Sequence, residues 1–167
     1  MTPLLPGSGH IEDGRHHFPI RVYYEDTDAG GIVYHATYLR FAERARSEFL
    51  RVIGWEHQKV LDETGLGWVV RRAEIDYRRP ARLDDALTVV TWIESMKGAS
   101  MRAVQSIRHN TVELVILHLQ LVLLNRSGRP GRLPAGLTAL IRPFLKAQES
   151  AADSCQAPSI PDRKSVV

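Results

Sequence analysis

An alternating segment near the start of the chain leads into a long segment of helical periodicity. From residue 20 to residue 24, apolar and polar side chains alternate, which predicts a half-buried strand. Apolar residues then recur at intervals of three and four, which predicts a helix over residues 36–53 that ends at Gly54. The members of this apolar stripe are Tyr34, Tyr38, Phe41, Ala42, Ala45, Phe49 and Ile53.

Four strand-like segments follow the helix, after an irregular connector over residues 55–67. The predicted strands cover residues 68–79, 87–96, 100–109 and 112–125, and a short helix is predicted over 134–145. The last strand is almost continuously apolar, which is typical of a central strand covered on both faces. One strand, one helix and four consecutive strands predict an α+β fold in which an antiparallel sheet wraps around the apolar helix.

Length and composition place these elements in a single domain. The chain has 167 residues, of which 44% are hydrophobic and 25% charged, as in an ordinary globular protein. We expect a flexible leader over residues 1–17, a folded domain over 18–145 and a flexible polar tail over 146–167. The net charge of +3 could attract anionic substrates or lipid headgroups, but it is too small to indicate nucleic acid.

Cysteine use and hydropathy indicate the compartment. The single cysteine, Cys155, cannot form an intrachain disulfide and is compatible with a reducing environment. No signal peptide is recognisable at the N-terminus. The longest apolar run, residues 112–124, is interrupted by polar residues and is shorter than the roughly 20 residues that span a bilayer. We therefore expect a cytoplasmic protein with at most peripheral membrane association.

The segment between the first strand and the helix concentrates the candidate chemistry. It carries the carboxylates Glu25, Asp26 and Asp28, followed by Gly30 and Gly31 at the entrance to the helix. Glycine permits backbone conformations closed to other residues and lets a ligand approach the main chain. The helix N-terminus offers unpaired amides and a partial positive charge, so an oxyanion could bind there beside a carboxylate.

Several short segments together carry a resemblance to a known family. They are residues 22–31, 33–35, 43–46, 69–72 and 80–85, together with Tyr38. In this order they resemble the YbgC-like acyl-CoA thioesterases, relatives of the 4-hydroxybenzoyl-CoA thioesterases, over about residues 19–145. The resemblance implies the hotdog fold and hydrolysis of an acyl-CoA to a carboxylic acid and free CoA. No cofactor is assigned from the sequence.

Asp28 is the leading catalytic candidate. The chain has no Gly-x-Ser-x-Gly nucleophile elbow and Cys155 lies in the polar tail, so a carboxylate is the natural group to attack the thioester or activate water. The resemblance places the catalytic aspartate at Asp28. It leaves open whether Asp28 attacks directly, forming a mixed anhydride, or acts as a general base. A purely structural role, in which Asp28 hydrogen-bonds its own turn, is the competing interpretation.

The resemblance also implies the other site residues. The backbone amide of His35 is expected to donate to the oxyanion, while its side chain either lines the thioester pocket or packs. Substrate contacts are assigned to Gly31, Val33, Tyr34 and Arg71. Candidates for the CoA phosphates are the cations near strand ends and turns, namely Arg71, Arg72, Arg78, Arg79, Lys97 and Arg102.

The remaining carboxylates receive other roles. Asp26 is expected to fix the turn, and Glu25 to face solvent or a neighbouring subunit. Some hotdog thioesterases use a helix glutamate as catalyst, which makes Glu43 the second candidate, although a solvated or interface position is the plainer interpretation.

No metal is assigned from the sequence. The segment that starts at Asp26 resembles the beginning of an EF-hand loop, but its twelfth position is Thr37 instead of the required glutamate. His16 and His17 have no evident ligand set near them in the sequence.

Partners and alternative functions follow from the same resemblance. Members of the family build their sites between subunits, so we expect a homodimer or homotetramer with an acyl-CoA substrate. Relatives are linked to phospholipid metabolism and to the cell-envelope Tol-Pal system, which suggests acyl carrier protein or a membrane-associated protein as a further partner. A hotdog dehydratase is one alternative, but the seven-residue separation of Asp28 and His35 does not match its Asp-x-x-x-x-His pattern. A non-catalytic acyl-CoA-binding module is the other, and it would not need Asp28 beside the glycines.

Overall fold

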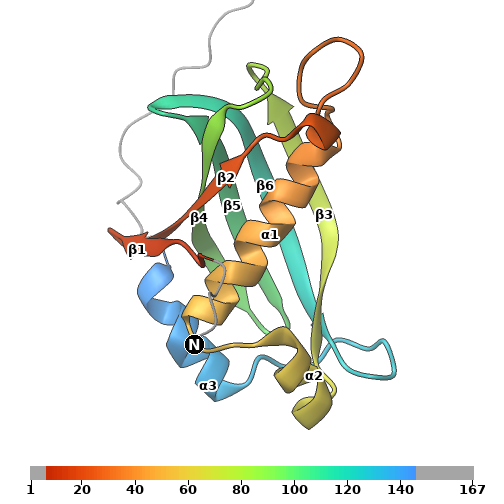
Figure 1. The fold of residues 1–167 in the computed structure, drawn as a ribbon. Coiled ribbons are helices and arrows are strands. Elements are labelled where there is room, and N and C mark those ends of the chain that lie inside the picture. Colours follow the sequence, from red (N-terminus) through yellow and green to blue (C-terminus); the bar gives the residue numbers. More distant parts are fainter. Residues whose placement is uncertain (1–6, 146–167) are drawn as a thin grey trace, which may run out of the picture.

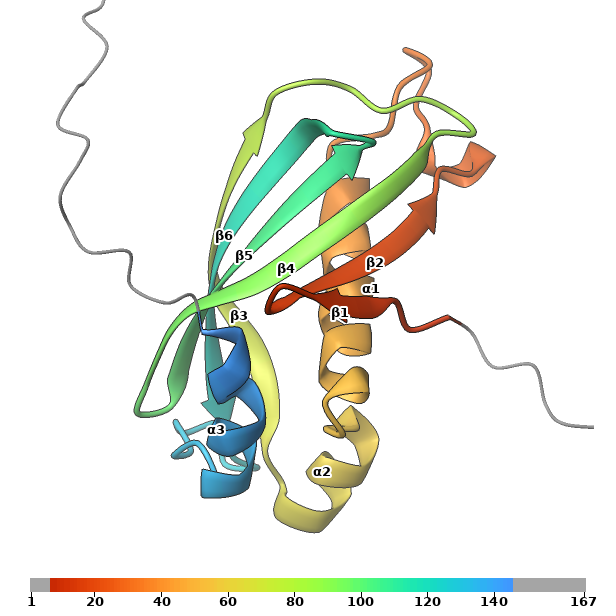
Figure 2. The same ribbon diagram turned by 90° about the vertical axis from the view of Figure 1, so that its left-hand side faces the viewer.

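A six-stranded antiparallel sheet wraps around one long helix, α1 (Figures 1 and 2). The computed structural model describes residues 7–145. The elements are β1 (His10–Glu12), β2 (Arg15–Arg21), η1 (Tyr24–Asp26), α1 (Thr37–Val52), α2 (His57–Thr64), β3 (Gly67–Tyr77), β4 (Ala86–Lys97), β5 (Ser100–His109), β6 (Val112–Leu124), α3 (Ala135–Ile141) and η2 (Arg142–Phe144). Their order across the sheet is β1-β2-β4-β5-β6-β3, and the predicted α+β hotdog architecture is confirmed.

Helix α1 buries the predicted apolar stripe against the sheet. Phe41, Ala42 and Ala45 have no exposed surface, and the small alanines let the helix lie close to β2, β4 and β5. Burying a side chain the size of phenylalanine contributes about 1.5–3 kcal/mol. Tyr34, which the periodicity placed in the stripe, is instead 47% exposed because the helix begins only at Thr37.

A buried polar network fixes the position of α1 on the sheet. Arg46 is buried, with 8% of the residue exposed, and its guanidinium donates to Oε1 of Gln105 on β5 at 2.7 Å. The Gln105 amide in turn donates to the Ala42 carbonyl and to the Thr91 hydroxyl, each at 3.0 Å. Glu43 pairs with the same guanidinium. Because a buried polar group is costly unless it is paired, this network disfavours rotation or sliding of α1, whose N-terminus bears the candidate site.

The expected flexible leader is wrong for residues 10–17, which form β1 and the start of β2. The two strands are joined by Asp13 and Gly14, whose φ angles of 48° and 68° give the double left-handed turn of a tight hairpin. An Asp-Gly pair is a strong hairpin signal, so the sequence contained the information that this interpretation missed. The folded unit therefore starts well before residue 18. The expected tail, residues 146–167, lies outside the described residues.

Three further predictions need correction. The strand expected over residues 20–24 is the end of β2, which stops at Arg21 and is followed by the 3-10 turn η1. The irregular connector contains α2, a short helix whose single buried residue, Val60, gave too weak a periodicity to recognise. Strand β6 is an interior strand as expected, but it is not covered on both faces. Its side turned away from α1 exposes His118.

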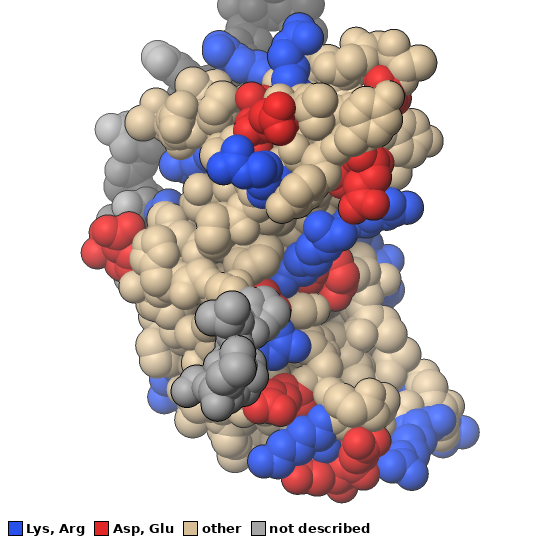
Figure 3. All heavy atoms as spheres, viewed as in Figure 1, with Lys and Arg blue, Asp and Glu red and all other residues tan. Residues whose placement is uncertain are grey.

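Charged side chains of both signs are scattered among uncharged ones on the face of the molecule that carries α1 (Figure 3). Lys and Arg are interspersed there with Asp and Glu instead of gathering in one block (Figure 3). No helix within residues 7–145 combines the length and apolarity that a membrane crossing requires.

Buried His16 makes the stability of the fold sensitive to mild acid. Its side chain is fully buried, and its Nε2 donates to the Ser8 carbonyl at 2.7 Å, while Nδ1 has no partner among the described residues. Burial lowers the pKa of His16 below its ordinary value of 6.5. The unfolded chain therefore binds the proton more readily, and the free energy of unfolding should fall as the pH drops below about 6.5.

We expect thermal melts to reveal this effect between about pH 7 and pH 5. His16→Leu, which has no group to protonate, should show a shallower decline in melting temperature than the unmodified chain. His118→Leu, at an exposed histidine, should keep the original decline. Parallel pH profiles for the unmodified chain and His16→Leu would contradict the assignment.

Candidate active site

The loop that connects η1 to α1 is held by its own backbone. The Asp28 N–H donates to the Ile32 carbonyl at 2.9 Å, and the Gly31 N–H donates to the Asp28 carbonyl at 3.0 Å. Gly31 adopts φ +70°, in the left-handed region that favours glycine. This tight turn places Asp28 and the helix entrance close together.

Asp26 ties the loop to the preceding turn. It is 4% exposed, and its Oδ2 accepts the Tyr23 N–H at 2.8 Å. Its carbonyl accepts the Tyr34 N–H at 2.9 Å. Asp26 therefore has the turn-fixing role predicted for it, and the neighbouring Glu25 is exposed.

A cavity of about 390 Å³ opens beside this loop. It is lined by Asp28, Ile32, Val33, His35, Tyr38, Tyr77, Arg78, Arg79 and Pro80. Five residues predicted for the site thus meet at one place, namely Asp28, Val33, His35, Arg78 and Arg79. Gly31 lies in the adjoining turn, and Tyr34 stands outside the lining with its ring 4.4 Å from that of His35, measured between centroids.

The hydrogen bonds within the loop determine which backbone amides remain available to a ligand. The amides of Gly31, Val33 and Tyr34 are all occupied by carbonyls within the chain. Within residues 7–145, the amides of His35 and Ala36 make no hydrogen bond, so they are open donors at the helix entrance.

One Asp28 oxygen is engaged in the turn. Its Oδ1 accepts the Gly30 N–H at 2.8 Å, so the structural interpretation of this residue is correct for that oxygen. Among the described residues, Oδ2 has no hydrogen-bond partner. Asp28 can therefore brace its own turn and still present a carboxylate oxygen at the cavity.

Two tyrosines build the apolar wall of the cavity. Their rings are in edge contact, with the Tyr38 and Tyr77 centroids 5.8 Å apart. The Tyr77 hydroxyl donates to the His35 carbonyl at 3.0 Å, and the Tyr38 hydroxyl accepts the Ala81 N–H at 2.9 Å. Burial raises the pKa of both hydroxyls, so they stay protonated at neutral pH. Tyr38 belongs to the apolar stripe predicted for the helix, whereas no local signal marked Tyr77, which lies 42 residues from its partner His35.

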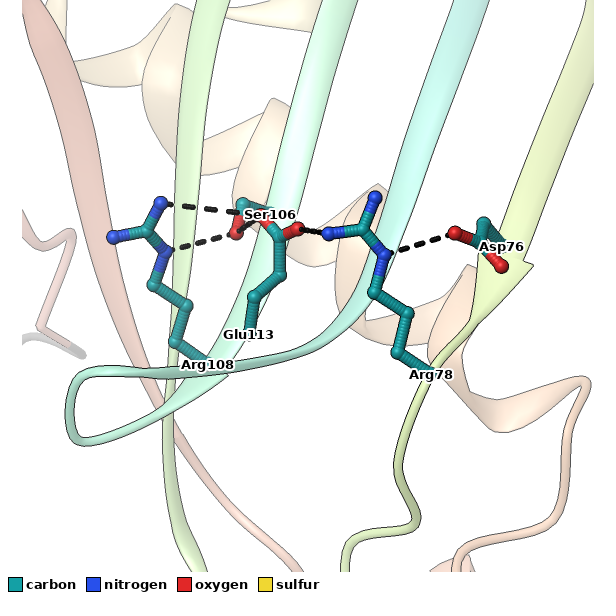
Figure 4. Close-up of polar contacts among 5 residues, drawn as sticks. All are labelled: Asp76, Arg78, Ser106, Arg108 and Glu113. Carbon is teal, nitrogen blue, oxygen red and sulfur yellow. Dashed lines mark hydrogen bonds and ion pairs between the residues drawn. The ribbon is translucent and has the colours of Figure 1, made fainter. Parts of the chain in front are cut away.

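The two arginines of the cavity differ in their hydrogen bonds and ion pairs. Arg78 belongs to a polar row that runs across the face of the sheet turned away from α1 (Figure 4). Its Nε donates to Asp76 at 2.8 Å and it also pairs with Glu113, which continues the row to Ser106 and Arg108. Hydrogen bonding to Asp76 raises the pKa of Arg78.

Arg79 is the cavity cation with free hydrogen-bonding capacity. It forms no ion pair within the part of the chain that the structure describes. Its neighbour Arg78 is committed to the polar row, so an incoming anion would meet Arg79 without displacing a carboxylate.

Five other predicted residues lie outside the cavity lining, namely Arg71, Arg72, Lys97, Arg102 and Glu43. Arg71 does not line the cavity. It sits in β3 at the bulge between Val70 and Arg72, on the outer strand of the sheet. Glu43 pairs with Arg46 and borders a separate cavity with His57.

A family model decides the classification. The model of the thioesterase-like superfamily matches residues 22–162. The chain belongs to the thioesterase-like superfamily. Acyl-CoA thioesterase YbgC of Haemophilus influenzae is 52% identical to this superfamily member over 97 residues, which are 58% of this chain and 71% of that protein. Acyl-CoA thioester hydrolase YbgC of Escherichia coli is 51% identical over 90 residues, 54% of this chain and 66% of that protein.

Solved structures agree with this placement in the thioesterase-like superfamily. A Bartonella henselae protein described as a probable thioesterase has 43% sequence identity and a TM-score of 0.70, and the match covers 72% of this chain and 99% of that one. The chain is accordingly a YbgC-like thioester hydrolase with a hotdog fold.

Proposed function

We propose that the cavity at the start of α1 binds the thioester of an acyl-CoA and that Asp28 drives its hydrolysis. The observation that carries this proposal is that Asp28 and His35 line one cavity and that the His35 amide makes no hydrogen bond among the described residues. Thioester hydrolysis needs a group that attacks the carbonyl or activates water, together with donors for the oxyanion. The names of the YbgC relatives support an acyl-CoA as the substrate.

Two routes use the same residues. In the first, Asp28 Oδ2 attacks the thioester carbon, CoA leaves as the thiolate, and water then hydrolyses the mixed anhydride to release the acid and regenerate the carboxylate. In the second, Asp28 takes a proton from water as the water attacks, and the proton passes to the departing thiolate. In both, the His35 amide, aided by the Ala36 amide and the helix dipole, stabilises the developing oxyanion.

The walls of the cavity offer separate contacts to the acyl group and to CoA. Val33, Tyr38 and Tyr77 offer an apolar surface to the acyl group, while Arg79 is placed to pair with an anionic part of CoA. Gly31 keeps the turn in place. Arg71 lies on β3 at the open edge of the sheet, away from this cavity. In this proposal it could contact substrate only across an interface with a second subunit at that edge.

A structure with a non-hydrolysable acyl-CoA analogue tests the proposal directly. The carbonyl oxygen should lie within about 3.2 Å of the His35 or Ala36 amide nitrogen, with Asp28 beside the carbonyl carbon. A thiol-release assay across short-chain, long-chain and aromatic acyl-CoAs would identify the preferred substrate. An analogue bound away from both Asp28 and His35 would refute the site.

We also infer that the active form is a homodimer joined along β3. This strand is the outer strand beyond β6, and its outward edge pairs with no other segment of residues 7–145. It exposes Val69 by 41% and Val70 by 45%, an apolar edge that natural proteins seldom leave uncovered. The cavity lies at the end of the same strand, so a partner subunit would border it.

Light scattering on the purified chain should give a mass of at least twice its 18.8 kDa. Val70→Asp, which places a charge on the open edge, should lower both the mass and the turnover. Leu61→Asp changes an apolar residue on α2 that is 42% exposed and should leave the assembly unchanged. An active monomer at micromolar concentration would contradict the dimer.

The wider biological setting is part of the same proposal. A tetramer, acyl carrier protein as a partner and a connection to the Tol-Pal system rest on the family resemblance. The cytoplasmic location rests on the single cysteine and on the hydropathy of the sequence. The dehydratase and the non-catalytic module lack a supporting observation at the cavity.

A further inference from the structure

A cluster of metal-ligating side chains lies on the N-terminal hairpin. His10, Glu12 and His17 each offer one ligand atom, and these atoms all lie within 4.8 Å of one another. The hairpin precedes residue 22, where the match to the family model begins. The sequence left His17 without ligands because His10 and Glu12 reach it only once the chain has turned back on itself.

Strand pairing makes this juxtaposition a consequence of the backbone. His10 is directly opposite His17 across the antiparallel ladder. Glu12 follows His10 by two residues, so it projects from the same face of the hairpin. The two imidazole rings are stacked with 5.2 Å between their centroids, and His10 Nε2 lies 3.9 Å from a Glu12 oxygen.

The surroundings leave His10 and Glu12 accessible to a ligand, while His17 is half-buried. His10 and Glu12 have side chains that are 66% and 64% exposed, so an ion can reach them and small rotations are unhindered. Arg15, opposite Glu12, holds its guanidinium over the Trp92 ring, with Cζ 5.0 Å from the centroid. On the other face of the hairpin, His16 is buried and bonded to Ser8, which anchors the strand ends that carry the ligands.

We propose that His10, Glu12 and His17 form a binding site for a divalent transition metal, and that this metal is Zn²⁺. Two imidazoles and one carboxylate are a ligand set that zinc accepts, with water in the fourth position. Tetrahedral ligands about 2.1 Å from zinc are about 3.4 Å apart, so ligand atoms that lie within 4.8 Å of one another need to approach by at most about 1.4 Å. Hard cations such as Ca²⁺ and Mg²⁺ prefer all-oxygen sites and are disfavoured here.

The bound ion would join β1 to β2 and would take no part in thioester hydrolysis. In both views β1 lies at one end of β2, while η1 and the loop to α1 lie at the other (Figures 1 and 2). The site is therefore independent of the proposed catalytic cavity, and its effect should be on the stability of the N-terminal hairpin.

Calorimetric titration of the full chain, without a polyhistidine tag, with ZnCl₂ in a non-chelating buffer tests the site. One Zn²⁺ should bind per chain with a dissociation constant of about 10 μM or tighter. His10→Ala, Glu12→Gln and His17→Ala should each weaken binding at least about 10-fold. His118→Ala, at an exposed histidine on β6, should stay within about twofold of the unmodified chain.

Two further measurements make the result decisive. Zinc should raise the melting temperature of the unmodified chain and of Asp28→Asn equally, because the site does not depend on the catalytic assignment. Cys155→Ser should bind zinc as the unmodified chain does. The proposal would be overturned if zinc does not bind stoichiometrically, or if the three hairpin variants bind zinc as tightly as the unmodified chain. Loss of binding in Cys155→Ser would overturn it as well.

Discussion

Replacing Asp28 by asparagine should reduce the turnover of acyl-CoA at least about 100-fold while leaving the fold intact. The amide keeps an oxygen that can accept the Gly30 N–H, as Oδ1 does at 2.8 Å in the native turn, so the loop should retain its shape. What the substitution removes is the negative charge and the basicity that either proposed route requires. Thiol release under substrate saturation, with circular dichroism as the check on folding, measures the two effects separately.

Asp62→Asn provides a matched control for Asp28→Asn. Asp62 lies on α2, is exposed, and accepts a hydrogen bond from Gln58 at 3.0 Å, so the same chemical change occurs away from the cavity. His35→Ala retains the backbone amide and should reduce turnover less than Asp28→Asn does. Near-native turnover in folded Asp28→Asn would remove Asp28 from the mechanism and make Glu43 the next residue to test.

Gly31→Val should reduce turnover by about 10- to 100-fold through the backbone of the loop. A Cβ at Gly31 meets no atom within 4 Å, so steric crowding is not the cause. The cost arises from φ +70°, a conformation that is unfavourable for an L-residue by about 1–2 kcal/mol and more so for a β-branched one. Relief of this strain would shift the turn between Asp28 and His35, and a displacement of about 1 Å can cost about 100-fold in rate.

Two variants separate the local effect from general destabilisation. Gly31→Asn should be much milder, because asparagine tolerates the left-handed region. Gly98→Val imposes a comparable strain, at φ +63° and with no atom within 4 Å of the new Cβ, but in the β4–β5 turn. Measured on the folded fraction, Gly98→Val should therefore keep its kcat. If Gly31→Val and Gly98→Val lose activity equally, the loop has no special role.

The accuracy of the predicted elements followed the strength of their local signals. Helix α1 and strands β3 to β6 were predicted within about two residues, because each carries many apolar residues at a clear period. Helix α2 buries only Val60 and was missed. The hairpin of β1 and β2 was also missed, although Asp13 and Gly14 are a recognisable turn pair, because histidines and charged residues surround them.

The amino-acid sequence by itself determined the helix, the main strands and the loop that bears Asp28, Gly31 and the His35 amide. These features depend on periodicity and on backbone preferences between near neighbours, which a single sequence displays. Tertiary structure alone decided what surrounds them. Tyr77 and Arg79 reach the cavity because β3 ends beside the start of α1. Arg78 lines the cavity as well, but its guanidinium pairs with Glu113 in the polar row. Such contacts join residues far apart in the chain. They depend on strand register and helix packing, which the order of apolar and polar residues only constrains.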